Sequence, residues 1–366
     1  MIMNISMATV TRAEIIGPPG GAPGIMWTMF DVSFVYLFIL LLLPRACTYL
    51  TDFTLMYPQN YTPDDIQNSI ATNLTDILNK GINLDVNPDM SFSFLGKSDY
   101  FDDKEFYKYL HGCSQRFIVL SSNIRGIRSK YDDLILRLND FNSSGSTIAA
   151  ITLQETQLLE GGGISHIDIP GYTCVYAYGT ASTKGGVATY IRNDLNFEIT
   201  KLPNYSSNIW EAIFVNVSGD SLGGKKFTVG NIYRPPRERV ELLDKFIMEF
   251  LNILDFFNNS QNVMIGGDFN LNLLSISEEN RVHNFLLQMF TYDFYPKILH
   301  PTRLSRFGGT LIDNFFCKAP DFSCFDAGIL TTRLSDHQAY SVSLPIPKSK
   351  KNIFLSTSFC QIKSFV

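Results

Sequence analysis

The segment Val263-Met-Ile-Gly-Gly-Asp268-Phe-Asn270 places an acid and an amide two residues apart at the end of an apolar run. The run predicts a buried strand, and Gly266-Gly267 predict a tight backbone turn where that strand ends. On an extended chain the acid and the amide point to the same side. Because buried polar groups need partners, the pair suits a core poorly, whereas it could hold a water and a phosphate at fixed positions. A Gly-Asp turn after a core strand is the alternative interpretation of this segment alone.

Polar side chains also mark the ends of other predicted strands. Each could be structural, but strand ends of packed sheets share an edge, so several such groups can converge in one cleft. The groups are Asn123, Gln154-Glu155, Asn231 with Tyr233, the acid Asp313 inside an apolar run, and Asp336-His337.

These residue types predict hydrolysis of a phosphodiester. Glu155 offers the hard oxygen ligand that Mg²⁺ prefers. Asp268 could act as general base on an attacking water, and Asn270 could donate a hydrogen bond to a phosphate oxygen. If the fold brings Asp313 beside His337, the carboxylate would hold the imidazole in one tautomer. One metal ion with these donors suffices for the reaction.

Eight short motifs contain or flank these residues, in the order Ser122-Asn123-Ile-Arg-Gly126, Leu153-Gln154-Glu155-Thr156, Gly185-Gly186-Val187-Ala188, Asn231-Ile-Tyr233-Arg234-Pro235-Pro236, Gly267-Asp268-Phe-Asn270, Pro301-Thr302-Arg303, Leu311-Ile-Asp313 and Leu334-Ser335-Asp336-His337. In this combination the chain resembles the endonuclease/exonuclease/phosphatase superfamily, from about Phe117 to Leu344. The first, fourth and sixth motifs are most similar to the apurinic-type endonuclease domain of non-LTR (LINE-type) retrotransposons.

The resemblance implies a fold and a set of roles. The fold is an α/β (α+β) four-layered α/β/β/α sandwich, with two packed sheets flanked by helices and the active site at one rim. Glu155 and Asp336 are the implied acids of the metal site, for Mg²⁺ or Mn²⁺. Thr302 and Ser335 stand where retrotransposon members carry a hydroxyl near the DNA. The implied catalytic residues are Asn123, Tyr233, Asp268, Asn270, Asp313 and His337.

Arg125 favours the retrotransposon branch, because cellular apurinic-site repair relatives usually carry an acid at this position. Retrotransposon proteins of this type continue into a reverse transcriptase, whereas this chain stops shortly after its last predicted strand. We therefore expect a truncated copy, a domesticated piece or a partial gene model, without polymerase activity. The string Tyr100-Phe-Asp-Asp103 resembles a polymerase motif but precedes the nuclease region, so chance explains it best.

The net charge of −5 gives no overall electrostatic footprint for nucleic acid, which argues against a passive DNA-coating protein. A nuclease needs acidic metal ligands and only a local basic rim. Basic residues lie in or beside the loops that leave the motif strands, and we expect them to grip DNA phosphates. They are Arg125, Arg128, Lys130, Lys184, Arg234, Arg237, Arg239, Arg303, Arg306 and Arg333.

Apolar periodicity around the motifs predicts strands with a few amphipathic helices, a pattern typical of two packed sheets with helices outside. Predicted helices span 131–138, 240–257 and 278–289, with a further short one at 66–78. Predicted strands span 117–123, 148–155, 172–178, 186–191, 210–217, 226–233, 263–268, 310–317 and 337–344.

The predicted domain covers residues 112–348, between a poorly ordered extension at 1–111 and a tail at 349–366. Within the extension, the apolar run 32–43 would span roughly 18 Å as a helix, short of the ~30 Å hydrocarbon core of a bilayer. The run is either a signal or anchor, or an inert or mispredicted extension. The six cysteines form no Cys-x-x-Cys pair, which predicts free thiols and no zinc site.

The sequence thus predicts a Mg²⁺-dependent endonuclease that nicks DNA, a monomer without a stable protein partner, in the nucleus or cytoplasm. A functional 32–43 run would instead make it membrane-anchored or secreted. Two alternatives stay open. One is a phosphatase or phosphodiesterase of the same superfamily that acts on a non-nucleic-acid substrate. The other is a retrotransposon remnant with no catalytic use.

Overall fold

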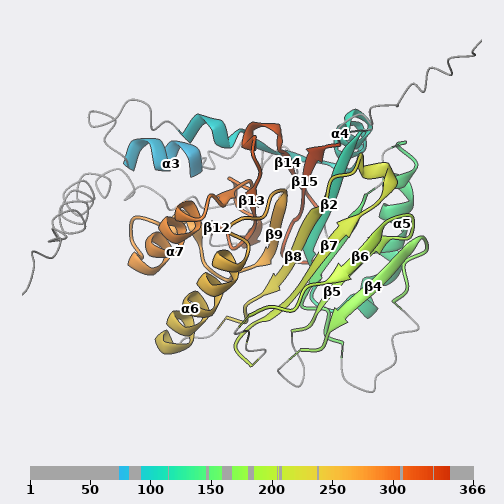
Figure 1. Cartoon of the computed structure of the whole chain (residues 1–366). Helices are drawn as coiled ribbons and strands as arrows, with labels where there is room; N and C mark the ends of the chain where they lie inside the picture. The colour runs from blue at the N-terminus through green and yellow to red at the C-terminus, as the bar shows by residue number, and fades with distance from the viewer. Residues whose placement is uncertain are drawn as a thin grey trace, which may run out of the picture. The chain divides into compact units, whose positions relative to one another are not determined.

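The computed structural model describes residues 74–81, 92–113, 115–145, 148–158, 167–179, 185–203, 205, 208–236, 239–305, 308–332 and 334–346. The apolar run 32–43, residue Lys184 and the tail 349–366 lie outside these ranges. In the described part, two sheets pack face to face and helices flank them (Figure 1). The predicted four-layered sandwich is confirmed.

Each sheet mixes parallel and antiparallel strands, and a short hairpin of β11 (Arg303–Ser305) and β12 (Gly308–Thr310) stands apart from both. The first sheet has seven strands, in the order β1 (Ser98–Phe101), β14 (Asp326–Leu330), β15 (Ala339–Pro345), β2 (Arg116–Asn123), β3 (Ala150–Gln154), β5 (Val187–Arg192) and β4 (Tyr172–Ala177). The second has six, in the order β10 (Tyr295–Pro296), β13 (Asp313–Lys318), β9 (Val263–Asp268), β8 (Phe227–Tyr233), β7 (Glu211–Ser218) and β6 (Asn196–Ile199).

Alternate residues of β2 enter two different cores. Phe117 and Val119 belong to the core between the sheets, where the Phe117 ring stacks on Phe227 with 4.2 Å between ring centroids. Ile118 and Leu120 pack on the opposite face of the sheet against helices. Successive strand residues point to opposite faces, so an apolar strand must be covered on both. Helices α4 (Asp103–Gly112) and α5 (Tyr131–Asn142) cover the first sheet, and α6 (Val240–Phe256) and α7 (Asn280–Thr291) cover the second.

Strand direction and register bring the polar strand ends to one rim. Strands β2 and β3 are parallel, as are β8 and β9, so the carboxyl ends within each pair lie together. Strand β13 runs antiparallel to β9, which sets its first residue, Asp313, opposite Asp268. Strand β15 runs antiparallel to β2, so His337, just before β15, lies near the end of β2. A hydrogen bond from Asn123 to Asp268 joins the two sheets at this rim.

Strand β9 continues through Gly266 and Gly267 to Asp268, so the tight turn expected at the two glycines is absent. Close packing explains them instead. A Cβ atom on Gly266 would lie 2.2 Å from the Phe315 ring, and one on Gly267 would lie 1.9 Å from the carbonyl oxygen of Ile232. Glycine marks a close backbone approach here, as it often does inside strands.

Residues 98–112 form part of the folded domain, which corrects the expected extension to residue 111. Strand β1 pairs in parallel with β14, and Phe106 and Leu110 of α4 are fully buried. The Asp102 carboxylate accepts a hydrogen bond of 2.7 Å from the backbone N–H of Glu105 and so caps α4. The string Tyr100-Phe-Asp-Asp103 is therefore the end of a strand and the start of a helix.

Other predictions outside the rim can be checked in part. Helix α3 (Leu74–Gly81) overlaps the predicted helix 66–78, of which residues 66–73 lie outside the described part. Four cysteines in the described part are free thiols, as predicted: Cys113, Cys174, Cys317 and Cys324. Across the ranges that the structure describes, no helix combines the length and the apolar character needed to cross a membrane.

Two buried amides connect the sheets just behind the rim. Gln154 Nε2 donates to Asn231 Oδ1 at 2.7 Å, and Asn231 Nδ2 donates to the carbonyls of Leu153 and Ala188. Both amide side chains are fully buried. Because Gln154 and Asn231 lie one and two residues from Glu155 and Tyr233, this link sets how the two sheets meet at the rim.

Asn231→Ala is expected to lower the free energy of unfolding by roughly 2–4 kcal/mol, since it removes several bonds and leaves Gln154 Nε2 without its strongest partner. Urea unfolding followed by fluorescence measures the change. Asn216→Ala is the matched control, because Asn216 is only half-buried and accepts one bond, from Thr228 at 2.8 Å. Equal losses of unfolding free energy in the two variants would show that the Gln154–Asn231 link stabilises the fold no more than the Asn216–Thr228 bond does.

Candidate active site

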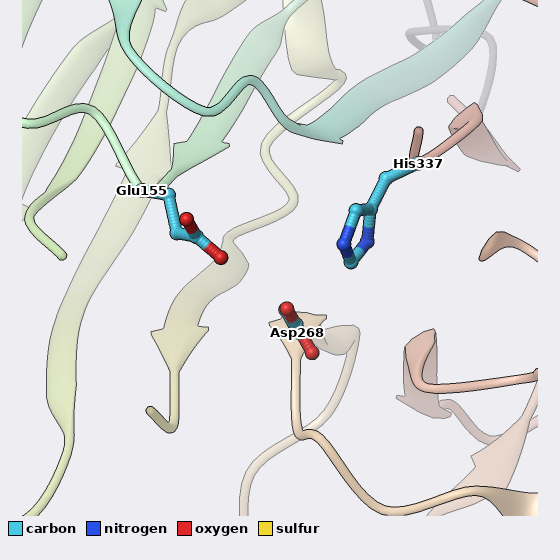
Figure 2. A group of neighbouring side chains, drawn as sticks. All are labelled: Glu155, Asp268 and His337. Carbon is cyan, nitrogen blue, oxygen red and sulfur yellow. The ribbon is translucent and has the colours of Figure 1, made fainter. Parts of the chain in front are cut away.

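Three buried side chains from separate elements face one gap at the rim (Figure 2). Glu155 follows β3, Asp268 ends β9 and His337 precedes β15. Each offers one ligand atom, and these atoms lie within 4.8 Å of one another. Within the described ranges this is the one group of histidines, cysteines and acids arranged to hold a metal ion.

Asn123 holds the two acids of this group together. Its Nδ2 atom donates to Glu155 Oε1 at 2.9 Å and to Asp268 Oδ2 at 2.8 Å. A carboxamide nitrogen has two hydrogens, so it can serve both carboxylates at once. Asn123 is fully buried at the end of β2, and it thereby fixes an acid of the first sheet against an acid of the second.

The Asp313–His337 pair expected from the sequence is present. The Nδ1 atom of His337 lies 3.0 and 2.9 Å from the two carboxylate oxygens of Asp313. An ionised carboxylate only accepts, so Nδ1 carries the proton and Nε2 is left for a substrate. The Thr302 hydroxyl donates to Asp313 Oδ2 at 2.7 Å and orients the carboxylate in turn.

The carboxylates at the rim lie close enough to one another to raise the pKa of neighbouring groups. Burial and the neighbouring Asp313 raise the pKa of Asp268 to about 7, although His337 and hydrogen bonds from Asn270 and Asn123 oppose the shift. Burial, Glu155 and Asp268 raise the pKa of Tyr233 well above its ordinary value. A divalent cation between the carboxylates would reverse these shifts, so the donor set fits Mg²⁺ or Mn²⁺.

His337 carries the one opposing charge among the three residues at the gap. Burial alone would lower the pKa of its imidazole, but Asp313, Asp268 and Asp336 raise it to about 9. The ring is therefore an imidazolium at neutral pH, with Nδ1 on Asp313 and a second N–H donor at Nε2.

Several site residues have a left-handed backbone that side chains other than glycine rarely adopt. The φ angles of Arg125, Glu155 and Asn270 are 49°, 49° and 48°. Such conformations cost about 1–3 kcal/mol each and persist where surrounding contacts impose them. The carbonyl of Glu155 accepts a 2.7 Å bond from the N–H of Gly126, which helps to hold its strained position.

Glu211 is a buried residue of the rim that the sequence analysis did not single out. Its carboxylate accepts a 2.6 Å hydrogen bond from the N–H of Gly186, and the Gly186 carbonyl accepts a 3.0 Å bond from the N–H of Thr156, next to Glu155. Glu211 thus supports the loop that carries Glu155. The signal available in the sequence was an acid between Trp210 and the apolar run Ala212-Ile-Phe-Val215.

Arg234 is buried and supports the segment that carries Asp268 and Asn270, and its predicted contact with DNA stays a prediction. Its guanidinium donates to the backbone carbonyls of Phe269 and Asn270, at 2.5 and 2.6 Å. The Asn270 amide donates back to the Arg234 carbonyl at 2.7 Å, while the Asn270 N–H donates to Asp268 at 2.9 Å. The segment around Asp268 is therefore fixed by its own backbone and by Arg234.

Asp336 lies at the mouth of the site, between two arginines. Its two oxygens pair with Arg125 at 2.8 Å and with Arg303 at 2.9 Å. Burial would raise the pKa of Asp336, but His337, Arg125 and Arg303 together lower it. Its metal-ligand role stays a prediction, because in this structure its charge is already balanced. Arg125 and Arg303 are 41% and 37% exposed and could reach a phosphate.

The hydroxyls of Thr302 and Ser335 form hydrogen bonds within the protein, and their nearness to DNA stays a prediction. Thr302 is fully buried against Asp313. The Ser335 hydroxyl donates to the Asn123 carbonyl at 2.7 Å and accepts from the His337 N–H at 3.0 Å. Both residues thus position side chains of the candidate site. Of the basic residues predicted to contact DNA, Lys184, Arg237, Arg306 and Arg333 lie outside the described part of the chain.

Comparisons with known proteins agree with this architecture. Residues 120–337 match the profile of the Endonuclease/Exonuclease/phosphatase family, and no curated protein matches the chain. An AP endonuclease from Leishmania major is similar in structure, with a TM-score of 0.54 and 14% identity over 64% of this chain and 89% of that chain. At this identity the likeness shows a shared fold.

Two further solved structures resemble the chain at a lower score. For the endonuclease domain of TRAS1, a telomere-specific non-LTR retrotransposon, the TM-score is 0.49 and the identity 14%, over 64% of this chain and 100% of that one. For a 3′ phosphatase from Neisseria bound to a product DNA hairpin, the TM-score is 0.49 and the identity 15%, over 62% and 99%.

Proposed function

The chain belongs to the endonuclease/exonuclease/phosphatase family, and on this premise we propose that it is a divalent-metal-dependent endonuclease that nicks DNA and derives from a non-LTR retrotransposon. One observation carries the proposal: Glu155, Asp268 and His337, from separate elements, meet at a gap of cation size. We further propose a monomer located in the nucleus or cytoplasm.

Glu155 is the residue that would hold Mg²⁺ or Mn²⁺, and Asp268 lies across the same gap. When bound, the ion would supply the positive charge that stabilises a phosphate as negative charge develops on it. Asn123 keeps the two carboxylates at a fixed separation through its 2.9 and 2.8 Å bonds, so the site needs little rearrangement on binding.

Asp268 accepts a proton from the attacking water, whose oxygen forms a bond to phosphorus while the bond from phosphorus to the 3′ oxygen breaks. The backbone N–H of Asn270 and the amide of Asn123 orient the Asp268 carboxylate for this transfer. His337 donates from Nε2 to a non-bridging phosphate oxygen. The Tyr233 hydroxyl, which is protonated at neutral pH, donates a hydrogen bond to the leaving 3′ oxygen.

Local charge and motif type support DNA as the substrate. Arg125 and Arg303 stand half-exposed at the mouth and can bind backbone phosphates on either side of the reacting one. Arg125 is also the residue by which the Asn-Ile-Arg-Gly motif resembles retrotransposon nucleases rather than repair enzymes.

The full chain is expected to convert supercoiled plasmid to open circles with Mg²⁺, and addition of a chelator is expected to stop the reaction. The same preparation is assayed on bis(p-nitrophenyl) phosphate and on phospholipid vesicles. If the protein hydrolyses bis(p-nitrophenyl) phosphate or the phospholipid but does not nick plasmid, it is a hydrolase of the family whose substrate is not DNA. Inactivity on all three would instead favour a remnant without catalytic use.

A further inference from the structure

The segment 297–301 connects β10 to Thr302 and has no regular secondary structure of its own. On one side, the Asn314 side chain holds it: Asn314 Oδ1 accepts from the N–H groups of Lys297 and Ile298, at 3.2 and 3.1 Å, and Asn314 Nδ2 donates to the Ile298 carbonyl at 2.7 Å. Asn314 follows Asp313 on β13. The placement of Thr302 against Asp313 therefore depends on how this segment is held.

The N-terminal strand β1 holds the segment by its side chains. Ser98 Oγ accepts a 2.8 Å bond from the N–H of Leu299, and the Tyr100 hydroxyl donates a 2.7 Å bond to the Pro301 carbonyl. The Tyr100 ring stacks on His300, with 5.7 Å between centroids. Pro301 directly precedes Thr302, so the Tyr100 hydroxyl acts one residue away from the group that orients Asp313.

Strand β1 also fixes the start of the loop that carries Asp336 and His337. The Phe101 carbonyl accepts from the N–H and the hydroxyl of Thr331, at 2.9 and 3.0 Å, where the chain leaves β14 toward Asp336 and His337. The two loops meet again at Thr302, whose carbonyl accepts a 2.6 Å bond from the N–H of Gln338.

Burial distinguishes this arrangement from the simple covering of a sheet edge. To cover the edge of the sheet, β1 needs only its backbone pairing with β14, and that pairing is present. Edge covering does not require polar side chains that are buried beneath the strand. Ser98 is fully buried and Tyr100 is 6% exposed, and both place their hydroxyls on the backbone of the segment 297–301. Buried hydroxyls are costly unless they bond, so these positions are specified by the contacts they make.

We propose that Ser98 and Tyr100 are positioning residues for the Asp313–His337 pair, and that they act through the 297–301 segment and Thr302. Strand β1 lies before residue 120, where the match to the family begins. The two positioning residues, Ser98 and Tyr100, therefore lie outside the matched region. The activity readout below rests on the proposed nuclease function, whereas the exchange readout does not.

The test uses the full chain with Tyr100→Phe and Ser98→Ala combined. We expect kcat for plasmid nicking to fall about tenfold to hundredfold, because a small displacement of a catalytic group has effects of this size. The KM for DNA should stay within about twofold, since no DNA contact is removed. In a Thr302→Ala background the same two substitutions should lower kcat by less than about twofold, because the hydrogen bond from Thr302 to Asp313 is already lost.

Native-state hydrogen exchange gives a readout that needs no substrate. The N–H groups of Thr302 and Gln338 are expected to exchange at least about tenfold faster in the double variant, because local opening of the segment becomes easier. Tyr109→Phe is the matched control. It removes a buried hydroxyl of α4 that has no hydrogen-bond partner among the described residues and therefore makes no bond to the segments that carry Thr302 and His337.

Three results would overturn the proposal: exchange rates equal to those of Tyr109→Phe, an unchanged kcat despite faster exchange, or a kcat effect that is fully additive with Thr302→Ala. A wild-type chain that fails to nick would refute the proposed function alone. In that case faster exchange at Thr302 and Gln338 would still support the positioning role of Ser98 and Tyr100. Unchanged exchange would refute that role as well.

Discussion

Asp268→Asn is expected to lower kcat for plasmid nicking by about a thousandfold, because it removes the carboxylate that Asn123 and the Asn270 N–H orient toward the gap as proton acceptor. The fold should survive, since the amide oxygen can still accept the bond from the Asn270 N–H, while the bond from Asn123 to the second oxygen is lost. Initial rates of nicking at saturating plasmid and Mg²⁺ measure the effect. Asp293→Asn, which changes an exposed carboxylate at the end of α7, is the matched control and should nick at the wild-type rate.

The same variant carries a prediction for stability. Burial raises the pKa of Asp268 to about 7 in the folded protein, so the folded state binds this proton more tightly than the unfolded chain. Stability from this group is therefore present at low pH and is lost as the pH rises toward and beyond 7. At pH 8 with chelator, Asp268→Asn should melt at the wild-type temperature or above it. A lower melting temperature, or nicking near the wild-type rate, would contradict the role assigned to this residue.

His337→Asn is expected to lower kcat by a similar factor, about a thousandfold, with little change in the melting temperature. The asparagine Nδ2 can replace His337 Nδ1 as donor to Asp313, so the buried carboxylate keeps a partner, while the Nε2 donor to the phosphate is lost. His283→Asn, at a partly buried histidine of α7, controls for the chemical change and should retain full activity.

A double variant separates a catalytic pair from two independent contributions. If Asp313 acts by orienting His337, Asp313→Asn should add less than about threefold to the loss already caused by His337→Asn. Independent, multiplying losses would show that Asp313 acts on the reaction without His337. Full activity in His337→Asn would remove the imidazole from the mechanism.

The elements that position the site were predictable because their apolar residues repeat with a clear period. Helix α6 and strands β2, β8 and β9 lie within two residues of their predicted bounds. Strands β6, β10, β11, β12 and β14 were missed, since each has five residues or fewer and too few alternations to detect. Strand β1 was missed for the same reason, and with it the folded part of the N-terminal region.

Predictions failed mainly where a residue type has several uses. Arginine suggests a phosphate contact, yet Arg234 is buried and binds backbone carbonyls. The family resemblance implies a Thr302 hydroxyl near DNA, and in the structure this hydroxyl donates to Asp313. Two glycines before an acid suggest a turn, yet Gly266 and Gly267 make room for Phe315 and the Ile232 carbonyl. Each outcome depends on a neighbour that is distant along the chain.

The amino-acid sequence by itself determined the chemistry available at the rim, because acids, amides and a histidine at strand ends are unfavourable unless they serve a site. It also determined the sandwich, through the period of its apolar residues. Only the tertiary structure decided which of these groups meet. Hydrogen bonds such as those of Asn123 and Tyr100 act over about 3 Å, and their partners, 145 and 201 positions apart, reach that distance only through strand pairing and register.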